Sequence, residues 1–135
     1  MNSVIYDTGM LIGLADAKAG ARTEHTGIVG LTRPVIPGPV LAQAWRSSPA
    51  TRRTLSWYIK DCELITTYTI DDYKRAGVMM GNVYLPGKKR PDVVDALVAL
   101  TAAKRVPSIV LTSDVADISA CLDTLPKASV DVRSV

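Results

Sequence analysis

Aspartates are the residues of this chain with the clearest potential for chemistry, and four stand out: Asp7, Asp95, Asp114 and Asp117. Asp95 interrupts the almost continuously apolar stretch 93–103, where a buried carboxylate is costly unless it is paired, hydrogen-bonded or bound to a metal. Gathered carboxylates also raise one another's pKa unless a cation neutralises them. Mg²⁺ and Mn²⁺ favour oxygen ligands and keep water molecules for reaction, so these types of residue predict metal-assisted hydrolysis, for example of a phosphodiester.

Short apolar runs alternate with helical patterns along the chain, and this order predicts where the aspartates lie. We expect strands over residues 4–6, 35–36, 64–67, 109–111 and 130–132, and helices over residues 10–15, 22–31, 40–45, 50–60, 71–84, 93–103 and 115–122. Such alternation predicts a three-layer α/β/α sandwich with a mostly parallel central sheet. Asp7 and Asp114 would then follow two strands at the sheet edge where ligands usually bind.

Two helices carry polar residues whose place matters for the site. In the helix over residues 22–31 we expect Ile28 and Leu31 to face inward and His25, the only histidine, to face solvent. An exposed single histidine makes histidine-based catalysis an unfavourable hypothesis. Gln43 is expected near the start of the helix over residues 40–45.

Length and composition limit the class of protein. With 135 residues, 47% of them apolar, the chain is predicted to be a single domain, 1–135, with a substantial core. A formal charge of +3 permits an anionic partner without requiring one. Cys62 and Cys121 form no CxxC pair and are expected to be small core residues. The first 16 residues do not read as a signal peptide and no apolar run is long enough to span a membrane, so we expect a cytoplasmic protein.

Four segments carry a resemblance to a known family. They are VIYDTGMLIGLAD (4–16), VIPGPVLAQAWR (35–46), DVVDALVALTAAK (92–104) and IVLTSDVADI (109–118), and the last two, in this order and spacing, are the most specific. Over nearly its whole length the sequence resembles the PIN-domain ribonucleases, especially the VapC-like toxins of VapBC-type toxin–antitoxin systems. The resemblance implies a parallel-sheet fold, Mg²⁺- or Mn²⁺-dependent RNA cleavage, a homodimer and an antitoxin that occupies the active site.

The resemblance also assigns roles to residues. The acidic metal-site positions match Asp7, Asp95, Asp114 and Asp117, with Thr112 as a supporting hydroxyl and Thr8 beside Asp7. Phosphodiester cleavage would suit the basic loop of Lys88, Lys89 and Arg90, which we take as the RNA-binding residues.

Gln43 is the departure from the family pattern. Many relatives carry a glutamate here, and an amide oxygen can still bind a metal or hold its water, but the site loses one negative charge. We therefore expect weaker metal binding than in a glutamate-bearing relative, and tighter Mn²⁺ binding in Gln43→Glu. The alternative function is a catalytically weak or inactive PIN-like module that binds RNA or protein.

Simpler structural roles compete with these assignments. Asp7 and Asp114 could be helix N-caps, Asp117 could be a helix residue without a ligand role, and Asp92 could serve only the helix dipole. The run Lys88 to Arg90 could be a solvated loop.

Two other enzyme classes also compete. Asp7, Thr8 and Gly9 spell the aspartic-protease tripeptide, but that fold is nearly all β. A haloacid-type phosphatase needs an aspartate where Gly9 stands.

Overall fold

Over the described residues the central sheet has five strands, and it matches the predicted architecture. The computed structural model describes residues 2–45, 48–85, 90–126 and 128–135. Its strands are β1 (Ser3–Tyr6), β2 (Val35–Pro37), β3 (Glu63–Ile65), β4 (Ser108–Thr112) and β5 (Val130–Ser134). They lie in the order β3-β2-β1-β4-β5, and every neighbouring pair is parallel.

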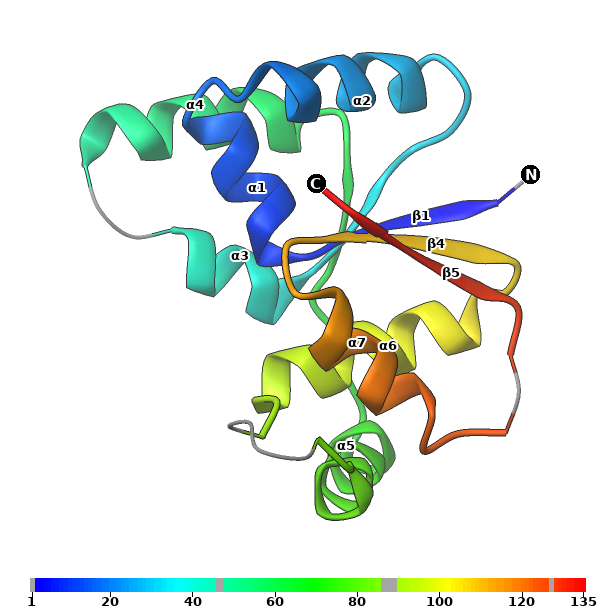
Figure 1. Cartoon of the computed structure of the whole chain (residues 1–135). Coiled ribbons are helices and arrows are strands. Elements are labelled where there is room, and N and C mark those ends of the chain that lie inside the picture. Colours follow the sequence, from blue (N-terminus) through cyan, green and yellow to red (C-terminus); the bar gives the residue numbers. More distant parts are fainter. Residues whose placement is uncertain (1, 46–47, 86–89, 127) are drawn as a thin grey trace.

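Helices cover both faces of this sheet. They are α1 (Thr8–Ala15), α2 (Ala19–Val29), α3 (Gly38–Ala44), α4 (Pro49–Ile59), α5 (Ile70–Asn82), α6 (Val93–Lys104) and α7 (Val115–Leu122). In Figure 1, α1, α2 and α4 lie on one side of the sheet and α5, α6 and α7 on the other. The predicted α/β/α sandwich is confirmed, and it does not match the nearly all-β fold of an aspartic protease. None of the helices in the described part of the chain has the length and apolar character of a membrane span.

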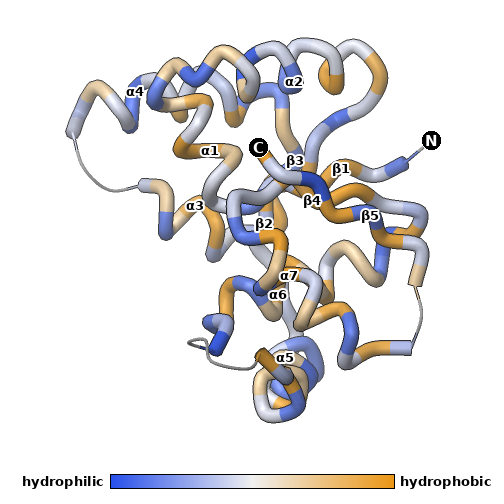
Figure 2. The backbone as a smooth tube through the Cα atoms, in the orientation of Figure 1, coloured by the Kyte–Doolittle hydropathy of each residue, from blue (hydrophilic) through white to orange (hydrophobic). Residues whose placement is uncertain are grey.

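Helix α6 is buried on nearly every side, as its apolar sequence predicts. All nine residues from 94 to 102 are buried. The helix packs between α5 and α7 and against β1 and β4. Hydrophobic segments also run along β1 and β4 through the centre of the molecule (Figure 2). Cys62 and Cys121 are buried free thiols, in agreement with the prediction that both are small core residues.

Helix α2 contradicts two predictions about its side chains. His25 is buried, at 3% exposure, and its two ring nitrogens lie 2.8 Å from the Tyr6 hydroxyl and 3.1 Å from Asp61 Oδ2. It lies on the inward face because Ala21 and Ile28 precede and follow it at helical spacing. Leu31 is 72% exposed because α2 ends at Val29, so Leu31 lies beyond the helix.

The position of Gln43 within its helix also differs from the prediction. Helix α3 begins at Gly38, with Pro39 in its first turn, because proline is well suited to the start of a helix. Gln43 is therefore the last residue but one of α3, not a residue near its start. Its side chain still reaches the predicted site.

Candidate metal centre

Asp7, Asp95 and Asp114 come together from three elements at one edge of the sheet. Asp7 follows β1, Asp114 follows the end of β4, and Asp95 is the third residue of α6. The register pairs Tyr6 with Leu111, so β1 and β4 end at the same level. The strand order reverses between these two strands, which is where open α/β sheets bind ligands.

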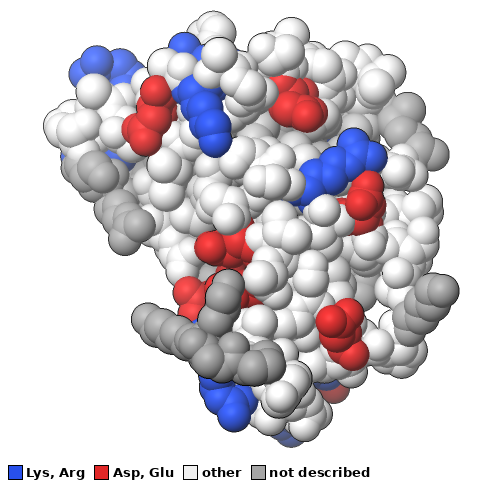
Figure 3. Space-filling model, viewed as in Figure 1, with Lys and Arg blue, Asp and Glu red and all other residues white. Residues whose placement is uncertain are grey.

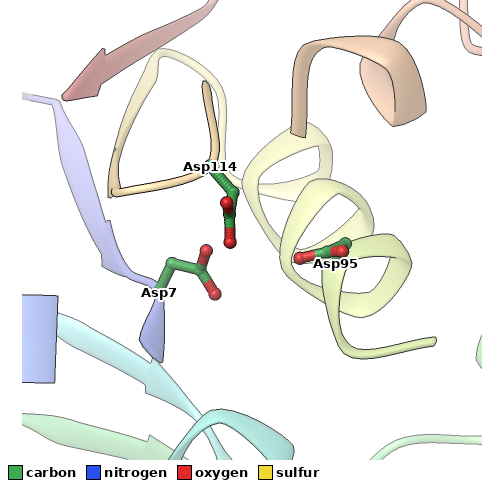
Figure 4. A group of neighbouring side chains, drawn as sticks. All are labelled: Asp7, Asp95 and Asp114. Atoms are coloured by element: carbon green, nitrogen blue, oxygen red, sulfur yellow. The ribbon is translucent and has the colours of Figure 1, made fainter. Parts of the chain in front are cut away.

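The three carboxylates point into a common space (Figure 4). Each offers one oxygen, and these oxygens all lie within 4.8 Å of one another. Asp7 and Asp114 do occupy N-cap positions, of α1 and α7, but neither side chain makes a capping hydrogen bond. Capping therefore does not explain where these two carboxylates point.

Thr112 orients Asp7. Its hydroxyl, which is fully buried, donates a hydrogen bond of 2.6 Å to Asp7 Oδ2. The oxygen of this hydroxyl also accepts a hydrogen bond of 2.9 Å from the backbone N–H of Asp114. Thr112, which was predicted as a supporting hydroxyl, therefore contacts two of the three aspartates.

Asp92 orients Asp95 through a capping box. The backbone N–H of Asp95 donates to Asp92 Oδ1 at 3.0 Å, and the backbone N–H of Asp92 donates to Asp95 Oδ2 at 3.1 Å. Asp92 is thus the N-cap of α6 and makes direct hydrogen bonds with Asp95, whereas the sequence predicted only an interaction with the helix dipole. Because this box uses one oxygen of Asp95, the other remains for a ligand.

Gln43 and Thr8 both lie at the site, as predicted, and they contact each other. The Thr8 hydroxyl donates to Gln43 Oε1 at 2.7 Å, and Gln43 Nε2 donates to Asp92 Oδ2 at 3.1 Å. Both polar atoms of the glutamine amide are therefore hydrogen-bonded to protein groups.

Burial and like charges make two of the aspartates hard to ionise. Burial raises the pKa of Asp95 from 3.8 to about 7, and the negative charges of Asp92, Asp7 and Asp117 add to this rise. Burial likewise raises the pKa of Asp7, against the hydrogen bond from Thr112. A cation among these carboxylates would favour their charged forms.

A small pocket of about 160 Å³ contains the site. It is lined by Asp7, Thr8, Gln43, Arg90, Asp92, Asp95, Asp114 and Asp117. A water molecule takes up about 30 Å³ in the liquid, so the pocket suits an ion with a few waters. A larger hollow of about 350 Å³ between α7 and β5 is lined by a single carboxylate, Asp123, among the described residues, so size alone does not locate the chemistry.

Of the other residues predicted for the site, the structure describes Asp117 and Arg90 but not Lys88 and Lys89. Asp117 lines the pocket from the first turn of α7 but is not one of the three gathered aspartates. Arg90 also lines it, and Arg90 Nη1 donates to the carbonyl of Met80 at 3.0 Å. Lys88 and Lys89 lie outside the described residues. Acidic side chains gather at the edge of the molecule where the strands end (Figure 3).

The donor set fits a hard divalent cation. The lining offers carboxylate, hydroxyl and amide oxygens. His25 instead contacts Tyr6 and Asp61, away from this pocket. The aspartate triad could hold a metal ion.

Two contributors to the site were missed or understated from the sequence alone. Asp92 was assigned only a dipole role, although the spacing Asp-x-x-Asp before an apolar run is a capping-box signal. Gly9 was noted only in the arguments about the protease tripeptide and the haloacid-type phosphatase. A Cβ on Gly9 would lie 2.9 Å from the backbone nitrogen of Ser113, so glycine allows the β1–α1 turn to approach the β4–α7 turn.

Comparison with known proteins adds no identity. The sequence matches no protein-family model and no curated protein.

Proposed function

We propose that this protein is a divalent-metal-dependent endoribonuclease that hydrolyses RNA phosphodiester bonds. The observation that carries the proposal is the triad of Asp7, Asp95 and Asp114, whose oxygens lie within 4.8 Å of one another at the edge where β1 and β4 end. The resemblance of four segments to the PIN-domain ribonucleases supports the choice of RNA as the substrate.

Each residue of the site has a distinct task in this proposal. Asp7, Asp95 and Asp114 would hold Mg²⁺ or Mn²⁺, with Asp117 available to a water at the rim. A bound ion of this kind lowers the pKa of water and stabilises the charge that develops on a phosphate during displacement. Thr112 keeps Asp7 directed into the site, and Asp92 does the same for Asp95.

The phosphate backbone of RNA needs cationic contacts near the triad. Arg90 supplies one, since it lines the same pocket as the aspartates. We propose that Lys88 and Lys89, its neighbours in sequence, extend this contact along the strand. Contacts of this kind give affinity without sequence selectivity.

The cellular role is part of the same proposal. We propose that the protein is the cytoplasmic toxin of a toxin–antitoxin pair, acts as a homodimer, and is inhibited by an antitoxin that covers the aspartates. A small reading frame directly upstream, whose product binds this protein and blocks cleavage, is the expected partner.

One observation favours a second candidate function, a weak or inactive RNA- or protein-binding module. Gln43 stands where many of the PIN-domain ribonucleases that the sequence resembles carry a glutamate, and both its polar atoms are hydrogen-bonded, to Thr8 and Asp92. The neutral amide of Gln43 therefore does not supply the negative charge that a glutamate would bring to the site.

A cleavage assay separates the two candidates. Protein is purified through denaturant and refolded, to remove any bound partner, and incubated with a mixed RNA pool and Mn²⁺ or EDTA. Wild type should cleave only with Mn²⁺, whereas Asp114→Asn should not cleave, because it lacks one of the proposed metal ligands. Asp114 is exposed, so this substitution should leave the packing of the core unchanged. Asp71→Asn, which removes an exposed charge at the start of α5, is the matched control. RNA retention by all three proteins without cleavage would support the binding module instead.

A further inference from the structure

A continuous chain of side-chain hydrogen bonds links the start of α1 to the start of α6. The Thr8 hydroxyl donates to Gln43 Oε1, Gln43 Nε2 donates to Asp92 Oδ2, and Asp92 Oδ1 accepts from the backbone N–H of Asp95. Thr8 directly follows Asp7, so the chain connects the neighbours of two proposed metal ligands. Three separate elements, α1, α3 and α6, contribute to it.

We propose that Gln43 is a positioning residue whose amide holds the amino end of α6 against α1, so that Asp95 faces Asp7 before a metal binds. This inference rests on the proposed metal site. It assigns Gln43 to the support of the ligands and not to the ligand set itself.

The two neighbours of Gln43 require an amide. Thr8 donates its proton toward position 43, whereas the ionised carboxylate of Asp92 can only accept one. An amide meets both demands, with one oxygen and one N–H₂ group. A glutamate at position 43 would still accept from Thr8, but it would set a second negative oxygen against Asp92 at hydrogen-bonding distance.

The bridge matters because the carboxylates around it repel one another. Asp95 is buried and lies in the field of Asp92, Asp7 and Asp117, so without a cation these charges favour separation of α6 from β1 and α1. A neutral bridge opposes that separation without adding charge. Side chains that orient metal ligands typically change metal affinity 10- to 100-fold when they are lost.

This role reverses the effect expected of Gln43→Glu from the sequence alone. If position 43 were a ligand, the added carboxylate would tighten Mn²⁺ binding. If Gln43 is a bridge, the glutamate breaks the contact with Asp92 and loosens Asp95. The two roles therefore predict opposite signs for one substitution.

A charge swap provides the decisive variant. In the double variant Gln43→Glu with Asp92→Asn, the carboxylate and the amide exchange places across the contact. The new asparagine Nδ2 donates to the new glutamate carboxylate, and the asparagine Oδ1 still accepts from the Asp95 N–H. Net charge equals that of wild type.

Calorimetry with Mn²⁺ measures the affinities of these variants. The affinity should fall about tenfold in Gln43→Glu and return to within about threefold of wild type in the swap. Unchanged or tighter binding in Gln43→Glu would overturn the bridge.

A metal-free readout keeps this test independent of the proposed function. Hydrogen exchange at the Asp95 amide should accelerate in Gln43→Glu and recover in the swap, because that amide donates to Asp92. If wild type binds no Mn²⁺, the metal site is wrong, yet the exchange pattern still tests the bridge. Leu55→Ala, a core change in α4, is the control for general destabilisation, and it should lower the melting temperature without selective exchange at Asp95.

Discussion

Thr112 and Asp7 are 105 positions apart in sequence, yet the threonine hydroxyl donates a 2.6 Å hydrogen bond to the aspartate carboxylate. Both residues lie at the ends of paired strands, and both are buried. The bond therefore fixes one carboxylate in the direction that Asp95 and Asp114 also face.

Replacing Thr112 with valine should weaken Mn²⁺ binding by about tenfold, since it removes a partner that orients a ligand while keeping the side-chain shape. Calorimetric titration with Mn²⁺ measures the effect. Thr112→Ser keeps the hydroxyl and should bind almost like wild type. Equal affinities for the valine and wild-type proteins would show that the hydrogen bond does not support the site.

Mn²⁺ should stabilise the wild-type protein and leave Asp114→Asn unaffected. A ligand that binds only the folded state adds about 2.7 kcal/mol when its concentration is 100 times its Kd. Thermal unfolding with and without Mn²⁺ checks this. Asp71→Asn should keep the full metal response, and a response retained by Asp114→Asn would remove Asp114 from the ligand set.

The metal-free protein should lose stability as pH rises from about 4 to about 7. Burial raises the pKa of Asp95 to about 7, so over this range the folded state keeps a proton that the unfolded chain has released. Stability gained from the neutral carboxyl is present at low pH and is lost as pH passes through the folded-state pKa.

Urea unfolding at pH 5 and pH 8 in EDTA measures this dependence, with Asp95→Asn as the comparison. The free energy of unfolding of Asp95→Asn should change less between pH 5 and pH 8 than that of wild type, because asparagine does not titrate. A wild-type profile identical to that of Asp95→Asn would place the titration elsewhere. Metal affinity should move in the opposite direction, increasing with pH, since a ligating carboxylate must release its proton.

Gly9→Ala should destabilise the protein by about 1 to 3 kcal/mol, the usual range for forcing atoms into a packed site. The added Cβ would lie 2.2 Å from Ser113 Oγ and 2.9 Å from the Ser113 backbone nitrogen, so the two turns that carry Asp7 and Asp114 must separate. Denaturant unfolding measures the loss.

Gly27→Ala is the matched control for Gly9→Ala. Its Cβ would meet open space on α2, so the alanine should stabilise the helix by up to about 1 kcal/mol. If both alanines stabilise the protein, the close approach at Gly9 is not a constraint.

The layers of the fold could be predicted from the sequence because the burial of each strand and helix determines which residue types it contains. Strands buried on both faces read as short apolar runs, and α6 reads as apolar all round because helices and sheet enclose it. Leu31 was misplaced because one helical pattern was extended past Val29, where the helix ends. The end of a helix depends on local backbone contacts that hydrophobic spacing does not encode.

Part of the candidate site could also be predicted, because some of its residues stand out against their neighbours in sequence. Asp95 was conspicuous because its neighbours are apolar, and Asp7 and Asp114 because they follow predicted strands. The roles of Gln43 and His25 depend on partners 19 to 49 positions away, among them Asp92 and Tyr6, and nothing local marks those pairs. A polar residue on a helix looks solvated until its distant partner is known.

The strand order has a consequence for how the site comes into being. Because β4 lies directly beside β1, the three aspartates meet only after a chain segment of more than 100 residues has closed on itself. An amino-terminal fragment that ends between residues 95 and 113 carries Asp7 and Asp95 without their third partner, Asp114. Closing so long a loop costs conformational entropy before any contact between the two strands compensates for it. A nascent chain therefore displays no complete triad until residue Asp114 has been made.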